Sequence, residues 1–372
     1  MNKKILILYT SVGLGHKSIA ENLGFALQKA GFIIRLKDIL KVQAKESSKL
    51  IKYFQKFYLF CNEKFPHFWA WIYNSANKGV LAFLTLPFRV PLAGRNYHQA
   101  LSLIKEFQPD LILSTNNIPS AVVSYLIKDN LYSGKFAIAF SDFHLHRYWI
   151  HKGCDLYLVN TEEQKQEMLG LGIEENKIVV CGITLKPKVD VNLLAVKEKF
   201  GIGQGQKVIL VGAGSLGIGL HLDTLDELVS INNAKIIIVC GNNQILFEDL
   251  RKKFEKNLNV KVLGFYTPMD ELYAITNIFI TKPGGLTTAE ALRWNLPLVV
   301  THFLPGGEQL NIEYLQKRAL IISKPANLKF LVEEELKTAN LRKKLTGSLE
   351  VKTLVQEGQG AVDAIFSLLH SV

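Results

Sequence analysis

The sequence predicts an α/β protein of two Rossmann-like domains that face each other across a cleft. Two series of short, continuously apolar segments alternate with helical patterns, and one linker separates the two series. A glycine-rich loop directly follows the first apolar segment of each series. Ligands of such folds bind at the carboxyl ends of the parallel strands, so we expect the functional site beside these loops.

The first series begins at residues 4–10, which are apolar and rich in β-formers, as in a buried parallel strand. A glycine loop follows at 11–15, and helical spacing over 16–30 ends at Gly31. Residues 32–36 then complete a βαβ unit. Further buried strands are expected at 111–114, 136–140 and 156–160, and mostly helical structure at 45–100.

A linker is expected over 184–206, where Pro187 and three glycines interrupt the alternation. We therefore assign residues 1–185 to an N-terminal domain and 200–346 to a C-terminal domain. A C-terminal helix within 347–372 is expected to pack back on the first domain. The strands of the second series are expected at 207–211, 236–240, 261–263, 278–281, 298–301 and 320–323.

Positive charge is concentrated in the first quarter of the chain. Residues 1–100 hold 15 Lys and Arg against 4 Asp and Glu, whereas the rest holds 29 of each. Twelve aromatic residues fall within 53–88. This pattern indicates an anionic partner surface, and phospholipid is favoured over nucleic acid because no nucleic-acid motif accompanies it. The alternative is a solvated helix that packs its aromatic side chains on the core.

Two further observations bear on the compartment. No apolar run reaches the ~18–20 residues of a membrane-spanning helix. The four cysteines lie far apart without paired spacing, so we expect neither a disulfide framework nor a zinc site. Both observations favour a reduced, cytoplasmic protein.

The first candidate site is the pair Gly13 and Gly15 followed by His16, at the start of a predicted helix. Glycines let the backbone approach a ligand, and a helix N-terminus offers unpaired N–H groups. The helix dipole disfavours the imidazolium, so a neutral His16 is suited to act as a general base. A helix-capping histidine without a chemical role is the alternative.

The second candidate, from Gly212 through Gly214 and Ser215 to Gly217, matches G-x-G-x-x-G between a strand and a helix. This pattern predicts a pyrophosphate cradle. The next strand ends at Cys240 without a carboxylate for a ribose, which weakens a nicotinamide dinucleotide interpretation.

The third candidate runs from Thr281 through Gly284 and Gly285 to Thr287 and Glu290. Its turn supplies N–H groups for a phosphate. Thr287 and Glu290 also fit a capping box, so Glu290 has either a capping or a ribose-binding role.

The fourth candidate comprises Gly306, Glu308, Gln309 and Asn311, whose carboxylate and amides suit sugar hydroxyls. An exposed, capped helix start is the alternative for this stretch.

The fifth candidate contains Asp142 with His144, His146 and His151. These residue types raise the possibility of a metal site. Their spacing on one loop has no second ligand cluster to complete it, and no Asp-x-Asp occurs in the chain, so no metal is predicted.

Together these motifs resemble the monogalactosyldiacylglycerol synthase and processive diacylglycerol glucosyltransferase family, which are GT-B glycosyltransferases related to the enzyme that adds GlcNAc to lipid I. The resemblance implies transfer of a hexose from a UDP-sugar to diacylglycerol with inversion and without a metal or other cofactor. It also implies a cytoplasmic enzyme attached peripherally to the inner face of the cell membrane, through residues 45–100. The matching stretches, in family order, are 13–20, 141–149, 264–269, 282–290 and 305–311.

By this resemblance, His16 deprotonates the acceptor hydroxyl and Asp142 lies in a loop on the acceptor side. Glu290 holds the ribose, and Phe265 and Tyr266 offer backbone contacts to uracil. The full set of implied donor-binding residues is Gly13, Gly15, Gly214, Ser215, Phe265, Tyr266, Gly284, Gly285, Leu286, Thr287, Glu290, Gly306, Glu308, Gln309 and Asn311.

Three questions stay open at this point. Residues 307–310 differ from the galactolipid synthase pattern, which leaves glucose, galactose and GlcNAc open as the donor sugar. A polyprenyl-linked acceptor is an alternative to diacylglycerol. A UDP-sugar 2-epimerase is a further alternative, although few carboxylates lie in the N-terminal loops to move protons on the sugar ring.

Overall fold

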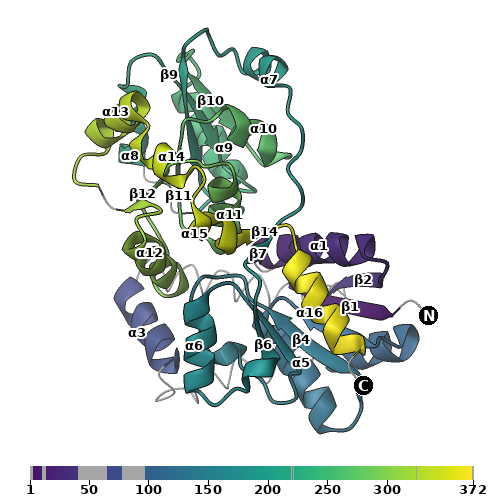
Figure 1. The fold of residues 1–372 in the computed structure, drawn as a ribbon. Helices are drawn as coiled ribbons and strands as arrows, with labels where there is room; N and C mark the ends of the chain where they lie inside the picture. The colour runs from purple at the N-terminus through teal and green to yellow at the C-terminus, as the bar shows by residue number, and fades with distance from the viewer. Residues whose placement is uncertain are drawn as a thin grey trace. The chain divides into compact units, whose positions relative to one another are not determined.

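The computed structural model describes residues 3–10, 14–40, 65–77, 97–218, 220, 222–323 and 325–370. The chain divides into two compact units (Figure 1). In the described part of the chain, each unit carries one six-stranded parallel sheet. Unit 1 comprises Met1–Lys186, Pro305–Gly307 and Thr353–Val372, and unit 2 comprises Pro187–Leu304 and Glu308–Lys352.

The sheet of unit 1 has the order β2-β1-β3-β4-β5-β6. The five strands predicted from apolar runs all form. Four of them are largely buried, as parallel strands inside a sheet are, whereas the edge strand β2 is half-exposed. The sixth was not predicted, since its three residues are too few to give a periodic signal. The strands are β1 (Lys4–Tyr9), β2 (Ile33–Asp38), β3 (Leu111–Ser114), β4 (Lys135–Ala139), β5 (Leu156–Val159) and β6 (Ile178–Val180).

Short caps fix where the helices of unit 1 begin. Asn116 accepts a hydrogen bond from the Ile118 N–H, and Thr161 forms a capping box with Gln164. A further helix occupies residues 97–107. The others are α1 (Leu14–Lys29), α3 (Pro66–Asn77), α5 (Asn117–Lys128), η1 (Arg147–Trp149), α6 (Glu162–Gly170), η2 (Glu175–Lys177) and α16 (Gln359–His370).

A returning C-terminal segment completes unit 1. β14 (Val355–Gln356) pairs in parallel with β7 (Ile183–Thr184). Helix α16 then packs against α1 and the β5–β6 edge of the sheet (Figure 1). Gly182, at φ +65°, permits the close approach, because an added Cβ would lie 2.4 Å from the Thr353 carbonyl oxygen.

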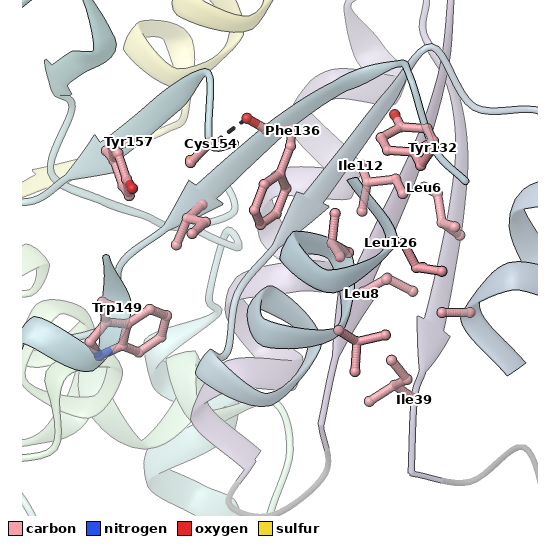
Figure 2. Close-up of a cluster of buried hydrophobic side chains, with 14 of the residues drawn as sticks. Leu6, Leu8, Ile39, Ile112, Leu126, Tyr132, Phe136, Trp149, Cys154 and Tyr157 are labelled. Atoms are coloured by element: carbon pink, nitrogen blue, oxygen red, sulfur yellow. Dashed lines mark hydrogen bonds between the residues drawn. The ribbon is translucent and has the colours of Figure 1, made fainter. Parts of the chain in front are cut away.

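One cluster of buried side chains forms the core on one face of this sheet (Figure 2). Leu6 from β1, Phe136 from β4 and Tyr157 from β5 are at most 2% exposed. Trp149 of η1 joins them and stacks on Phe140 at 5.1 Å between ring centroids. Each such side chain contributes roughly 1.5–3 kcal/mol by burial. The core therefore holds η1 against the strands whose loops carry the candidate residues.

The sheet of unit 2 has the order β10-β9-β8-β11-β12-β13. All six predicted strands of the second series form. They are β8 (Lys207–Gly212), β9 (Ala234–Val239), β10 (Val260–Leu263), β11 (Ile278–Thr281), β12 (Leu298–Val300) and β13 (Ile322–Ser323).

The helices of unit 2 alternate with these strands. α7 lies in the segment predicted as a linker. Among the described residues, no helix of either unit has the length and apolar character to span a membrane. The helices are α7 (Leu193–Lys199), α8 (Leu222–Val229), α9 (Gln244–Lys253), α10 (Met269–Ile275), α11 (Gly285–Arg293), α12 (Gly307–Lys317), α13 (Leu328–Thr338), α14 (Asn340–Leu345) and α15 (Leu349–Leu354).

Candidate active site

His16 lies in the first turn of α1, at the carboxyl end of β1. Its carbonyl oxygen accepts a hydrogen bond from Thr115 Oγ1 at 2.9 Å, and Thr115 directly follows β3. β1 and β3 are neighbours, and the strand order reverses between them, so His16 occupies the ligand-binding switch point of its sheet. Its ring centroid lies 6.0 Å from that of Trp149.

The surroundings of His16 favour the neutral imidazole. Burial lowers the pKa of its side chain, and the nearby Asp142 carboxylate opposes that shift with a smaller effect. The Nδ1 atom is buried and has no hydrogen-bond partner among the described residues. The N-terminus of α1 acts in the same direction as burial. His16 is therefore available as a proton acceptor at neutral pH.

Asp142 is held in the loop after β4 by several hydrogen bonds. Ser141 Oγ donates to its Oδ2 at 3.0 Å. Its carbonyl oxygen accepts from Asn160 Nδ2 and from Gln164 Nε2, both at 2.9 Å. These two amides are buried, so the loop is fixed relative to β5 and α6. The carboxylate is thereby placed where its charge acts on His16.

The three histidines of the same loop have separate partners. Within the described ranges, no three His, Cys, Asp or Glu side chains gather as a metal site would require. Two of the histidines instead attach the loop to helix α3. Tyr73 Oη lies 3.2 Å from His144 Nε2, the Tyr73 carbonyl oxygen lies 3.0 Å from His146 Nε2, and Asn117 Oδ1 lies 3.0 Å from His151 Nε2.

In unit 2, the glycine loop after β8 is tightly packed. Gly214 and Gly217 have φ values of +73° and +65°. An added Cβ would lie 2.6 Å from Lys282 Cε at the first position and 2.3 Å from Asn243 Cβ at the second. The Ser215 carbonyl accepts from the Asn242 N–H at 3.0 Å, so the loop is anchored to the turn after β9. Only glycine fits both of these positions.

The turn after β11 presents an uncapped helix N-terminus. Gly284 is the N-cap residue of α11 and, having no side chain, makes no side-chain capping bond. The first N–H groups of a helix lack intrahelical partners, which suits them to bind a phosphate. The helix starts at Gly285, so Leu286 and Thr287 lie inside its first turn. Thr287 is not the N-cap residue, and the capping-box alternative for Glu290 is therefore wrong.

Glu290 is held by a neighbouring helix instead. Its Oε2 accepts a hydrogen bond from Tyr273 Oη of α10 at 3.0 Å. The pKa of the Glu290 carboxyl is raised to about 7, mainly because the group is buried. The charge of Asp270 also raises this pKa, whereas the hydrogen bond from Tyr273 and the charge of Arg293 lower it. The Glu290 carboxyl is thus held in a fixed orientation, with a pKa far above that of an ordinary glutamate.

The predicted sugar-binding residues before and within α12 differ in their burial and in their hydrogen-bond partners. Glu308 forms an ion pair with Lys282 at 2.5 Å, and its other oxygen accepts from the Leu304 N–H at 2.7 Å. Asn311 is fully buried, and its Nδ2 donates to the Pro283 carbonyl, so in this structure it ties α12 to the turn after β11. Gln309 is half-buried and bonds Glu313 at 3.1 Å, and Gly306 has φ +102°.

Two of the remaining predicted residues, Phe265 and Tyr266, lie in the turn after β10. Phe265 is 58% exposed after β10, and the hydroxyl of Tyr266 bonds Glu271 and Lys199. Gly15 lies in the first turn of α1, and a Cβ added to it would meet no atom of the described residues within 4 Å. Gly13 lies outside the described residues.

Two residues around this site were not predicted as ligands from the sequence. Tyr273 lies 17 positions from Glu290, and nothing in the local pattern connects them. Lys282 has a signal that could have found it, since it is a cation placed directly between a strand and a Pro-Gly-Gly turn. Each of these two residues bonds a side chain of another element, so its role depends on how the elements pack.

The two Rossmann-like units define a GT-B fold. The S. aureus MnaA–UDP co-structure aligns with 100% of this chain and 98% of its own, with a TM-score of 0.64 and 11% identity. Acinetobacter baumannii MurG aligns over 100% of both chains, with a TM-score of 0.58 and 14% identity. At these identities the likeness establishes the fold alone.

Sequence comparison shows which protein families the chain resembles. Residues 16–185 match the family model of monogalactosyldiacylglycerol (MGDG) synthase, and residues 208–353 match the glycosyltransferase family 28 C-terminal domain. The two matches together account for most of the chain, and they show it to be a glycosyltransferase with regions similar to both family models. Processive diacylglycerol β-glucosyltransferases of Bacillus cytotoxicus and Bacillus subtilis are each 28% identical to it. The alignments cover 92% and 86% of this chain, and 88% and 83% of the respective relatives.

Proposed function

We propose that this glycosyltransferase moves a hexose from a UDP-sugar to diacylglycerol and forms a glycosyldiacylglycerol with inversion at the anomeric carbon. The observation that carries the proposal is the neutral His16, fixed at the switch point of its sheet beside Asp142. The phosphate-type loops of unit 2 and the names of the curated relatives support the same reaction.

In the proposed reaction, His16 accepts the proton of the acceptor hydroxyl as its oxygen attacks the anomeric carbon. The bond from that carbon to the phosphate oxygen breaks, and UDP leaves with the electron pair. Asp142 stabilises the imidazolium that forms. The N–H groups at the start of α11 stabilise the charge on the leaving diphosphate, so the proposal includes no metal ion or other cofactor.

Helix α3 is the proposed contact with the membrane. Phe65 precedes the helix and Phe68 and Trp71 lie on it, each more than half exposed, and the last two rings stack at 6.0 Å. Tyr73 faces the protein and bonds the His144 side chain. Aromatic rings suit the interfacial region of a bilayer, and the basic residues of this part of the sequence suit anionic headgroups. We propose peripheral attachment to the inner face of the cell membrane.

The test is to incubate the purified protein with diacylglycerol in anionic liposomes and with UDP-glucose, UDP-galactose and UDP-GlcNAc in separate reactions. Lipids are then analysed by mass spectrometry. We expect a hexosyl-diacylglycerol with at least one donor, and none when diacylglycerol is omitted or when His16 is replaced by alanine. If UDP binds but no donor gives a glycolipid, diacylglycerol is the wrong acceptor. A new sugar nucleotide formed without an acceptor would favour epimerisation.

A further inference from the structure

Lys282 lies among the loops that follow β8 and β11 in unit 2, and the mechanism above assigns it no role. It directly follows β11, and its Nζ lies 2.5 Å from Glu308 Oε1. The two side chains are only 21% and 16% exposed. A part-buried ion pair of this kind is desolvated on both sides, so either partner is destabilised when its counter-charge is removed.

The lysine side chain also contacts the glycine loop after β8. An added Cβ on Gly214 would lie 2.6 Å from Lys282 Cε and 3.8 Å from Nζ. The carbonyl oxygen of Lys282 accepts from the Gly284 N–H at 3.0 Å, at the N-cap of α11. Lys282 therefore belongs to the turn after β11, and its ammonium group lies beside the glycine loop after the neighbouring strand β8. Both loops suit a diphosphate.

Both carboxylate oxygens of Glu308 already have a partner in this arrangement. One carboxylate oxygen is paired with Lys282 and the other accepts from the Leu304 N–H at 2.7 Å. A hexose hydroxyl that bonds Glu308 shares an oxygen with one of these partners, and it gains the full charge of that oxygen when the partner leaves. A diphosphate arriving at the loops carries more negative charge than a single carboxylate, and it competes with Glu308 for the same ammonium.

We propose that Lys282 is a diphosphate-binding residue that exchanges partners when the donor binds. The ammonium leaves Glu308 for the β-phosphate of the UDP-sugar, and the released carboxylate oxygen accepts a hydrogen bond from the hexose. The leaving-group phosphate and the sugar are thereby recognised together, through one ion pair. This inference rests on the proposed function, since it requires a nucleoside diphosphate sugar as the donor.

The exchange predicts effects of opposite sign for the two partners. Lys282→Met should weaken UDP binding about tenfold, because a charge-assisted contact to phosphate is lost. Glu308→Gln should leave UDP affinity equal or raise it a few-fold, because the competing carboxylate is gone, while hexose transfer slows. Lys282→Arg keeps the charge and should stay within about threefold of the wild-type affinity for UDP.

The measurement is titration calorimetry of UDP and of uridine with the full chain. Uridine affinity should be unchanged in all variants, because it lacks the phosphates. Lys253→Met is the matched control, since its 2.7 Å pair with Asp226 lies on an exposed surface of the same unit. Thermal unfolding of each variant shows whether it is folded.

Each possible result has a distinct meaning. If the wild type binds UDP and Lys282→Met binds it equally well, the inference is wrong. If Glu308→Gln weakens UDP binding as much as Lys282→Met does, the ion pair only supports the fold. If Lys282→Met fails to fold, the ratio of UDP to uridine affinity in Lys282→Arg and the sign of the Glu308→Gln effect decide the question. If the wild type binds no UDP, the proposed function itself fails.

Discussion

The hydroxyl of Tyr273 donates a hydrogen bond to Glu290 at 3.0 Å, from helix α10 to helix α11. The tyrosine is 3% exposed, so its position is fixed by the core of unit 2. The tyrosine orients the carboxylate of Glu290, which lies in α11 a few residues after the uncapped N-terminus of that helix. A carboxylate held in this way can accept hydrogen bonds from both hydroxyls of a ribose.

Replacing Tyr273 by phenylalanine should weaken uridine binding by about three- to tenfold. Such a bond to a charged group is worth about 1.5–3 kcal/mol, and only part of that loss is transmitted to ribose binding, because Glu290 itself is retained. Removing it also raises the pKa of Glu290 further, because the bond lowers that pKa at present. The midpoint of the pH dependence of uridine affinity should therefore move upward, which loss of packing alone would not cause.

A matched control for this variant is Tyr97→Phe. The Tyr97 hydroxyl donates a hydrogen bond to Asp129 at 2.7 Å on the surface of unit 1. The substitution therefore removes the same kind of bond outside the nucleotide loops. Uridine affinity and its pH midpoint should be unaffected. An unchanged pH midpoint in Tyr273→Phe would count against the positioning role.

Binding of uridine should depend on pH through Glu290. The carboxyl has a pKa of about 7, and only its ionised form accepts from both ribose hydroxyls. Affinity should fall as the pH drops from 8 to 6, by up to about tenfold. Glu290→Gln should bind uridine weakly and without this pH dependence. Uridine is the suitable probe because the phosphates of UDP titrate in the same range.

Replacing His16 by alanine should lower the transfer rate by about 10²–10⁴, as expected for loss of a general base. UDP affinity should change less than twofold, because His16 belongs to unit 1 and the phosphate loops to unit 2. In the wild type, the rate should fall with decreasing pH only below the ordinary histidine range, since burial lowers the pKa of His16. His98→Ala, an exposed histidine of unit 1, is the control.

A UDP affinity that falls in step with activity in His16→Ala would contradict this assignment. The histidine would then support the nucleotide site or the fold. Calorimetry with UDP and a rate measurement on the same preparation separate these outcomes.

Replacing Phe68 and Trp71 by serine should reduce binding to anionic liposomes without lowering turnover of a short-chain, water-dispersed diacylglycerol. Both rings are more than half exposed, so little packing is lost on substitution. Phe330→Ser is the control, because Phe330 is 62% exposed on unit 2. Co-sedimentation with liposomes measures binding. Equal sedimentation of the double variant and the wild type would remove α3 from the proposed membrane contact.

The strands and the loops after them could be predicted from the sequence because buried parallel strands are continuous apolar runs. Sheet topology then places the ends of β1, β8 and β11 at ligand-binding positions. The side-chain pairs could not be predicted. The pairing of Tyr273 with Glu290, and of Lys282 with Glu308, depends on how separate elements pack.

The capping box shows how a local pattern can mislead. Thr287 and Glu290 have the required spacing, but the pattern does not state where the helix begins. Because α11 starts at Gly285, Thr287 is already within the helix and is not its N-cap residue. A shift of three residues changes the role of Glu290 from capping to facing a neighbouring helix.

Neither unit is a continuous piece of the sequence. Ribosomal synthesis delivers the six strands of unit 1 long before β14 and α16, whose residues Ala361 and Ile365 are fully buried against it. During translation, unit 1 must keep that apolar surface uncovered while all of unit 2 is made. Proteins that acquire a core element this late expose aggregation-prone surface in the meantime. The nascent chain is therefore expected to depend on chaperones until residue 365 has left the exit tunnel.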